Sequence, residues 1–259
     1  MEFFDSHAHL DDEKFNDDRD EIIGKIYNEG ITKFVSAGYN LQSTKNAIQL
    51  SKKYKFIYPT CGISPNDIPQ TKQELWKQLD EIRNILNIEK KIIAIGEIGL
   101  DYYWNTENKE LQKKAFIAQI QIANEYNLPI QIHTREAIMD TIEILKNNNV
   151  KNKGIFHCCP LNRELVKEAL KLGFYISFAG PVTFKNSKNA EEIINIVPLN
   201  KMLIETDSPY LAPEPLRGTR NNPINVKHIA KKIADVKNIG ISEIAKITYD
   251  NALKIFSIN

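Results

Sequence analysis

The stretch "FFDSHAHLDD" (residues 3–12) carries the pattern that decides the fold. An apolar run opens it, and His7 and His9 follow, with acids on both sides. In an extended segment alternate side chains share a face, so Asp5 and His7 lie on one face and His9 continues it just past the strand end. Two converging imidazoles could hold a metal ion, and a turn with surface histidines is the alternative. This stretch alone leaves both interpretations open.

The same pattern recurs along the chain. Short runs of β-branched and aromatic residues alternate with longer segments of helical period, in about eight pairs. Several runs are apolar on both faces, as buried parallel strands are. The sequence therefore predicts an α/β fold, a (β/α)8 TIM barrel, with its last crossover helix at 226–237 and an extra C-terminal helix at 242–256. The predicted strands are residues 3–7, 33–38, 56–62, 92–98, 129–133, 154–158, 175–179 and 202–207.

Length and composition are those of an ordinary soluble protein. The chain has 259 residues, of which 42% are hydrophobic and 26% charged, so a single domain over 1–259 is expected. No apolar run reaches the length of a membrane span, so no membrane association is expected. The N-terminus lacks the pattern of a signal or transit peptide, and we expect a cytoplasmic protein.

Charge and cysteine content narrow the function classes. A formal charge of +1 argues against a protein coated in positive potential for nucleic-acid binding, so any phosphate recognition must be local. The three cysteines are odd in number and two of them are adjacent, which does not indicate a disulfide framework. Nothing in the sequence implies an obligate protein partner.

Histidines and carboxylates gather at the predicted strand ends. Four of the five histidines lie there, and imidazole with carboxylate suits zinc, manganese, iron or nickel. Six candidate donors exceed the needs of one tetrahedral ion, whereas two ions about 3.5 to 4 Å apart would use them and leave positions for substrate. We therefore expect two divalent ions, drawn from Mg, Mn, Zn, Co and Ni. The candidate ligands are His7, His9, Glu97, His133, His157 and Asp207.

The carboxylates near these strand ends are assigned different places. Glu97 lies in "IGEIGLDYY" (residues 95–103) and is the bridging candidate. The alternative is that Glu97 caps the next helix, but that helix is expected to begin near Thr106, which is too far from Glu97 for a cap. Glu205 and Asp207 are two apart on one predicted strand face, with Asp207 the better ligand. Asp5 and Glu205 are expected to support the ligands from behind.

Arginines and aromatic residues near the same strand ends could bind substrate. Guanidinium groups recognise phosphate bidentately, so Arg135, Arg217 and Arg220 are candidate phosphate anchors, with solvated surface charge as the alternative. Tyr102 and the two aromatic residues after it could stack a nucleobase or pack as the rim of the barrel.

Together these segments resemble the TatD family of metal-dependent deoxyribonucleases, within the amidohydrolase-like barrels. The resemblance implies a (β/α)8 barrel that hydrolyses phosphodiester bonds of DNA, with exonuclease action among its activities. It also implies that His7, His9 and Asp207 hold one metal, that His133 and His157 hold the other, and that Glu97 bridges them. The matching segments are "DSHAHLD", "GEIGLDYY", "QIHTRE", "FH" at 156–157, "YISFAGPVTF", "LIETDSPYLAP" and "RGTRN".

The sequence departs from the family in three places. Ser64 and Asn66 stand in "CGISPND", where many members carry histidines. Thiols of Cys158 and Cys159 follow His157, where an aromatic and a small residue are usual. Asn222 stands where an acid is frequent.

The resulting hypothesis is a metal-dependent deoxyribonuclease that acts on single-stranded DNA or on DNA ends. A metal-bridging hydroxide would attack phosphorus in line, with Glu97 and Asp207 as the catalytic carboxylates. One alternative is a hydrolase of a small phosphoester, lactone or cyclic amide, although such relatives often carry a carboxylated lysine where Glu97 stands. A non-catalytic metal-binding barrel is a further alternative.

Overall fold

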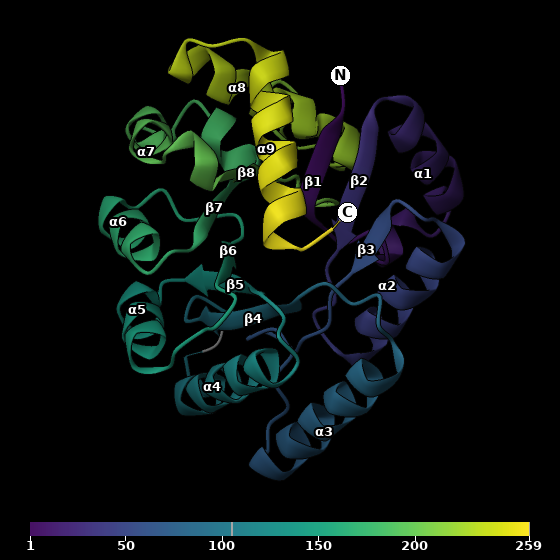
Figure 1. The fold of residues 1–259 in the computed structure, drawn as a ribbon, viewed down its shortest axis with the longest axis vertical. Coiled ribbons are helices and arrows are strands. Elements are labelled where there is room, and N and C mark those ends of the chain that lie inside the picture. The colour runs from purple at the N-terminus through teal and green to yellow at the C-terminus, as the bar shows by residue number, and fades with distance from the viewer. Residues whose placement is uncertain (105, 259) are drawn as a thin grey trace. The chain divides into compact units, whose positions relative to one another are not determined.

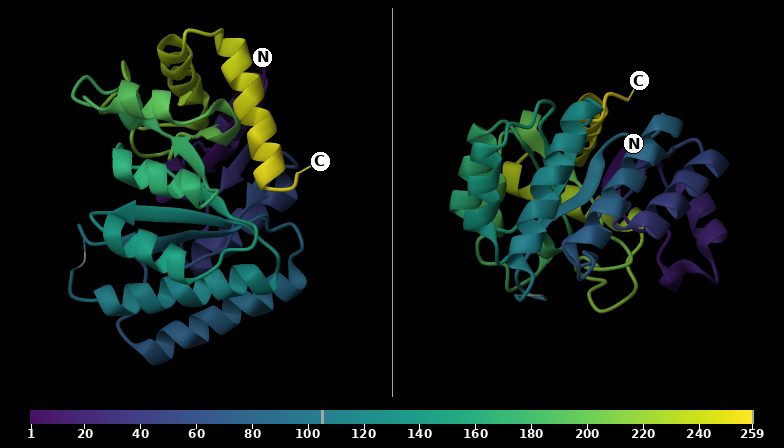
Figure 2. Two further views of the ribbon diagram at one scale, coloured as in Figure 1. Left: turned by 60° about the vertical axis from the view of Figure 1, so that its left-hand side comes forward. Right: turned by 90° about the horizontal axis from the view of Figure 1, so that it is seen from below.

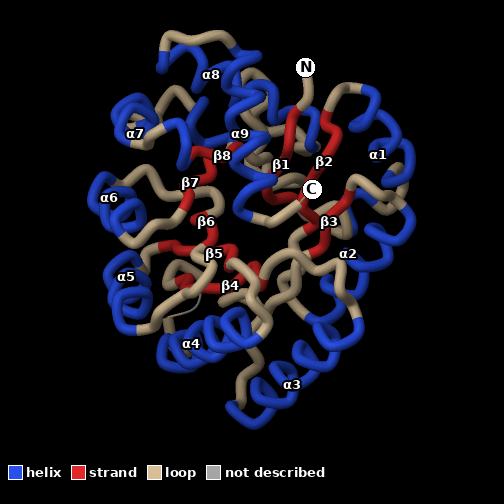
Figure 3. Tube along the Cα trace, viewed as in Figure 1, coloured by secondary structure: helices blue, strands red, loops and turns tan. Residues whose placement is uncertain are grey.

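A computed structural model describes residues 1–104 and 106–258. The chain forms two compact units: the first unit comprises 1–36 and 157–259, and the second unit comprises 37–156. Eight strands alternate with helices along the chain, as predicted (Figure 1). Within each unit the strands lie inside and the helices cover them (Figure 3). The expectation of a single domain over 1–259 stays a prediction.

The first unit is built around four strands. β1 pairs in parallel with β2, and β7 pairs in parallel with β8. β1 also lies beside β8, where the Ser6 hydroxyl donates to the Ile204 carbonyl oxygen over 3.0 Å. The elements are β1 (Phe3–Ala8), α1 (Arg19–Asn28), β2 (Ile31–Ser36), α6 (Arg163–Lys171), β7 (Tyr175–Phe178), α7 (Ala190–Ile196), β8 (Met202–Ile204), α8 (Val226–Lys237) and α9 (Ile241–Ile255).

The second unit contains the other four strands. β4 and β5 are parallel, with Gly99 opposite His133 and Asp101 opposite Arg135. β6 pairs with β5, and β3 approaches β4 through a bridge between Cys61 and Ile95. α3 lies beside α4 on the outside of this unit (Figure 2). The elements are α2 (Leu41–Lys53), β3 (Ile57–Pro59), α3 (Lys72–Ile88), β4 (Ile95–Asp101), α4 (Lys109–Glu125), β5 (Ile130–Arg135), α5 (Ile138–Asn147) and β6 (Gly154–Phe156).

Within the first unit, the C-terminal helix α9 packs at the beginnings of the strands. Tyr249 and Phe256 contact the Phe4 ring with centroid separations of 5.8 and 6.1 Å. Asn251 donates to the carbonyl oxygens of Leu199 and Met202. This end of a β/α fold serves stability, while the opposite strand ends carry the polar residues.

Several predicted boundaries were wrong. β4 continues to Asp101 rather than ending at 98, because Gly99 stays in the ladder opposite His133. β8 ends at Ile204, so Glu205 and Asp207 follow the strand instead of sharing one of its faces. Helix α4 begins at Lys109 rather than near Thr106. Among the described residues, none of the helices has both the length and the apolar character that a membrane crossing requires.

Candidate metal centre

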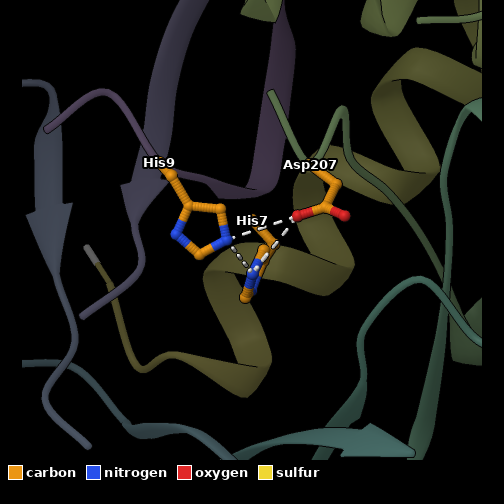
Figure 4. Close-up of side chains that lie close together, drawn as sticks. All are labelled: His7, His9 and Asp207. Atoms are coloured by element: carbon orange, nitrogen blue, oxygen red, sulfur yellow. Dashed lines mark hydrogen bonds and ion pairs between the residues drawn. The ribbon is translucent and has the colours of Figure 1, made fainter. Parts of the chain in front are cut away.

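His7, His9 and Asp207 form a tight group in the first unit (Figure 4). His7 lies in β1, His9 follows the strand, and Asp207 lies in the segment after β8. The Asp207 backbone N–H donates to the His7 carbonyl oxygen over 3.0 Å, and the His9 N–H donates to the Ser208 carbonyl oxygen over 2.7 Å. These two backbone bonds bring side chains from the two ends of the sequence together.

The spacing of these donor atoms fits one divalent ion. The Nε2 atoms of His7 and His9 are 3.2 Å apart, and Oδ1 of Asp207 is 3.3 Å from His9 and 3.8 Å from His7. Ligand atoms bonded to an ion at about 2.0 to 2.1 Å in a tetrahedron lie about 3.3 Å from one another. The three side chains are buried or nearly so, which restricts their movement. Imidazole nitrogen and carboxylate oxygen are the donors that such an ion takes.

The charge state of Asp207 suits a cation site. Burial raises the pKa of this carboxyl, but the hydrogen bond from His9 and the nearby imidazoles of His157, His9 and His7 lower the pKa more. The net result is a pKa below the usual range. Asp207 is therefore ionised at neutral pH.

Asp5 bonds the backbone on either side of this group, and its predicted supporting role stays a prediction. Its carboxylate accepts hydrogen bonds from the Thr206 N–H at 2.9 Å, the Thr206 hydroxyl at 2.6 Å and the His7 N–H at 3.3 Å. Burial is the largest cause of a shift that raises the pKa of Asp5 to about 8. Asp5 thus joins β1 to the residue just before Asp207.

His157 lies against His7 and is held by Glu205. The two imidazole rings stack with centroids 3.9 Å apart and planes 18° apart. Oε1 of the buried Glu205 accepts from the Cys158 backbone N–H over 2.6 Å and lies 3.4 Å from His157 Nδ1. Glu205 therefore holds the backbone that follows His157, and its predicted role in supporting a metal ligand stays a prediction. Burial, together with the Glu205 charge, raises the pKa of the neighbouring Cys159 thiol, so this thiol is not a reactive nucleophile.

Glu97, His133 and Asp101 form the polar group of the second unit. Oε1 of Glu97 lies 3.0 Å from His133 Nδ1, and Oδ2 of Asp101 lies 2.9 Å from His133 Nε2. Carboxylates thus face both ring nitrogens. A histidine whose second nitrogen bonds a carboxylate has a fixed ring orientation, as metal-binding histidines usually do. A cation beside Glu97 and Nδ1 of His133 would find two ligands here.

Asp101 was not predicted as a site residue, because the strand was expected to end before it. The buried Gln112 side chain fixes its backbone: Oε1 accepts from the Asp101 N–H and Nε2 donates to the Asp101 carbonyl oxygen. Asn66 donates to Asp101 Oδ2 over 3.3 Å. One of the departures from the family pattern therefore supports the carboxylate that orients His133. The signal in the sequence was a charged residue within the otherwise apolar end of β4.

Replacing Asp101 with asparagine should lower the affinity for Mn²⁺ or Zn²⁺ by about 10- to 100-fold, because the amide cannot accept the hydrogen bond from His133 in the same way. Calorimetric titration of the metal-stripped protein measures this change. Asp80→Asn on the exposed surface of α3 is the matched control and should leave metal affinity unchanged. If Asp101→Asn binds the metal as tightly as the wild-type protein does, Asp101 has no role in positioning His133.

The predicted substrate residues have different surroundings. Arg135 is exposed at the end of β5. Tyr102 is partly buried, its hydroxyl donates to Asp140 over 2.7 Å, and Lys109 lies over its ring. Arg217 is exposed and lies over the Phe184 ring at 4.2 Å. Arg220 forms a two-pronged ion pair with Asp18, so its guanidinium already has a structural partner.

The remaining roles join residues of different units. The resemblance pairs His133 with His157 at one metal and lets Glu97 bridge both metals. His157 belongs to the first unit, while Glu97 and His133 belong to the second. These two roles stay predictions.

Comparison with known proteins identifies the relatives of this chain. The family described as TatD related DNase matches residues 4–257. The uncharacterized metal-dependent hydrolase YabD of Bacillus subtilis is 41% identical over 257 residues, which cover 99% of each chain.

Solved structures are similar to this chain over nearly its whole length. The TatD homologue YJJV from Escherichia coli has a TM-score of 0.92 at 22% identity and covers 99% of this chain and 98% of its own. A TatD family hydrolase from Entamoeba histolytica has a TM-score of 0.89 at 24% identity, with 100% and 99% coverage. The likeness confirms the predicted (β/α)8 barrel fold. The chain therefore belongs to the TatD family and is a metal-dependent hydrolase.

Proposed function

We propose that this protein hydrolyses phosphodiester bonds of DNA, acting on single strands or on strand ends. The observation that carries the proposal is the spacing of His7, His9 and Asp207, which suits a divalent ion. The name of the family, TatD related DNase, supports the choice of substrate.

Two sets of side chains would hold divalent ions. His7, His9 and Asp207 would hold one, and Glu97 with His133 would provide ligands for another. Such ions supply Lewis acidity, which acidifies water and offsets the negative charge that develops on phosphoryl oxygens. Because nitrogen donors are softer than Mg²⁺ prefers, Mn²⁺, Co²⁺, Ni²⁺ and Zn²⁺ are the better candidates on chemical grounds.

The protein's own residues supply the remaining steps. Asp207 is ionised, so its carboxylate can accept a proton from water as well as bind a cation. His133 is held in one orientation by Asp101, which avoids reorganisation during the reaction. Arg135, exposed at the end of β5, can present two N–H groups to a phosphate.

Metal removal and substrate choice test this proposal together. Protein stripped with EDTA should lose hydrolysis of a labelled single-stranded oligonucleotide, and Mn²⁺ or Co²⁺ should restore it, because the ligands alone cannot acidify water. The substrate panel contains single- and double-stranded DNA, RNA, bis(4-nitrophenyl) phosphate, a lactone and a cyclic amide. A variant with both His7 and His9 replaced by alanine, purified identically, controls for contaminating nuclease.

The panel separates the alternatives. Faster turnover of DNA than of the small substrates supports the proposal. If the lactone, cyclic amide or small phosphoester is the better substrate with every ion, the protein is a hydrolase of small molecules. If the reconstituted protein turns over none of them, the proposal of DNA hydrolysis fails.

A further inference from the structure

The loop after β4 exposes two aromatic side chains next to the second polar group. Tyr103 is 49% exposed and Trp104 is 68% exposed. Their rings meet edge to face, with centroids 4.8 Å apart. A large aromatic pair that remains in water has not been placed there by core packing. Two adjoining exposed rings at the active end of a β/α fold indicate a surface for a ligand.

Arg135 steadies this pair. Its guanidinium carbon lies 3.7 Å from the Tyr103 ring centroid and 5.4 Å from that of Trp104. The closer contact occupies one face of the tyrosine, so the more exposed indole is the ring best able to receive a second planar group. Stacking uses the face of the guanidinium and leaves its N–H groups able to bind a phosphate at the edge.

One carboxylate fixes both this loop and the candidate metal ligand His133. Oδ1 of Asp101 accepts hydrogen bonds from the backbone N–H groups of Tyr103 at 2.9 Å and Trp104 at 3.2 Å. Oδ2 of the same side chain bonds His133 Nε2. The aromatic pair is therefore held at a defined position beside His133.

Tyr102, the first of the three aromatic residues predicted to stack a nucleobase, is not suited to this task. Its hydroxyl donates to Asp140, which also bonds Lys113, and the Lys109 ammonium lies 4.4 Å from its ring centroid. Burial and the Asp140 hydrogen bond raise the pKa of this phenol. Tyr102 ties the loop to α4 and α5.

We propose that Trp104, braced by Tyr103 and Arg135, stacks an unpaired nucleobase while the Arg135 edge binds the phosphate of the same strand. This inference rests on the proposed function and specifies how the site selects its substrate. Every base has a π-face, so stacking tolerates any sequence. A base inside a duplex already has both faces covered, so this stacking platform of Trp104, Tyr103 and Arg135 selects single strands and frayed ends.

Intrinsic fluorescence gives a direct test that needs no turnover. The chain has two tryptophans, and Trp76 lies on α3, so Trp76→Phe leaves Trp104 as the sole indole reporter. We expect oligo(dT) added in EDTA at low salt to quench this emission. An abasic strand of the same length keeps the phosphates and lacks the bases, so it should not quench. Equal quenching by both strands, or none by either, overturns the proposal.

Kinetics provide the second test. Trp104→Ala should raise KM for a single-stranded oligonucleotide by about 5- to 150-fold with little change in kcat, because stacking contributes binding rather than chemistry. Trp104→Phe should restore most of the affinity, since it keeps a π-face. Trp76→Ala removes a surface aromatic residue elsewhere and should leave KM unchanged.

The outcomes separate this proposal from the proposed function. If oligo(dT) quenches the emission, the abasic strand does not, and the protein does not cleave DNA, stacking on Trp104 is supported and the proposed nuclease activity is contradicted. If the protein cleaves DNA and Trp104→Ala leaves KM unchanged, the proposed nuclease activity is supported and base stacking on Trp104 is contradicted. Quenching by oligo(U) as strong as by oligo(dT) shows a base platform that does not distinguish RNA from DNA.

Discussion

Replacing Glu97 with glutamine is expected to lower kcat for single-stranded DNA by about 10³-fold while the protein stays folded. Glutamine has nearly the same shape, but it removes the negative charge that a divalent ion requires from this nearly buried side chain. It also weakens the contact with His133 Nδ1, which is 3.0 Å from the carboxylate. Release of end-labelled nucleotides in Mn²⁺ measures the loss, and circular dichroism with a thermal melt measures the fold.

Glu143→Gln provides the matched control for charge. Glu143 is exposed on α5 of the same unit, so the same chemical change there should leave kcat unchanged. Wild-type turnover by Glu97→Gln, with contaminating nuclease excluded, would remove Glu97 from the catalytic machinery.

Replacing Gly99 with alanine should lower the free energy of unfolding by about 2 to 6 kcal/mol. Gly99 has φ of +140°, which L side chains rarely adopt, and a Cβ atom there would lie 2.0 Å from the His133 carbonyl oxygen. β4 and β5 would have to separate at the point where they place Glu97 and His133. Urea unfolding followed by fluorescence measures the loss of stability, and metal titration measures the damage to the site.

Gly24→Ala is the matched control for this substitution. Gly24 lies on the exposed face of α1, and nothing lies within 4 Å of a Cβ added there. Alanine at this helical position should stabilise the protein by about 0.5 to 1 kcal/mol. A Gly99→Ala protein as stable as the wild type would contradict the close approach of the two strands.

The strand order was predictable from the sequence, but the strand ends were not. The regions around β3, β6 and β8 were predicted as residues 56–62, 154–158 and 202–207, yet their ladders stop at Pro59, Phe156 and Ile204. Beyond these points the regular ladder gives way to bends, where single backbone bonds such as that from the Asp207 N–H to the His7 carbonyl oxygen are joined by bonds to side chains. The hydrogen bonds from Thr206 to Asp5 are an example. β-propensity does not report such bends, because they depend on residues distant in sequence.

The candidate metal ligands could be named because their chemistry is visible in single residues. His7, His9 and Asp207 are brought together as the pattern of strand ends suggested. Asp101 and Gln112 were missed, since their importance lies in hydrogen bonds that only the folded chain reveals. Trp104 was among the three aromatic candidates for stacking, but the choice of Trp104 over Tyr102 depends on its exposure and on the position of Arg135, which no periodicity encodes.

The bonds between Asp5 and Thr206 join residues that are 201 positions apart. A nascent chain emerges from the ribosome at about 5 to 20 residues per second, so roughly 10 to 40 s separate the synthesis of these two residues. During that interval the N-terminal histidines have no Asp207 to complete their ligand group. The three donor side chains therefore come together only after residue 207 has been synthesised, and a truncated polypeptide that stops before residue 207 would lack the Asp207 carboxylate of this candidate site.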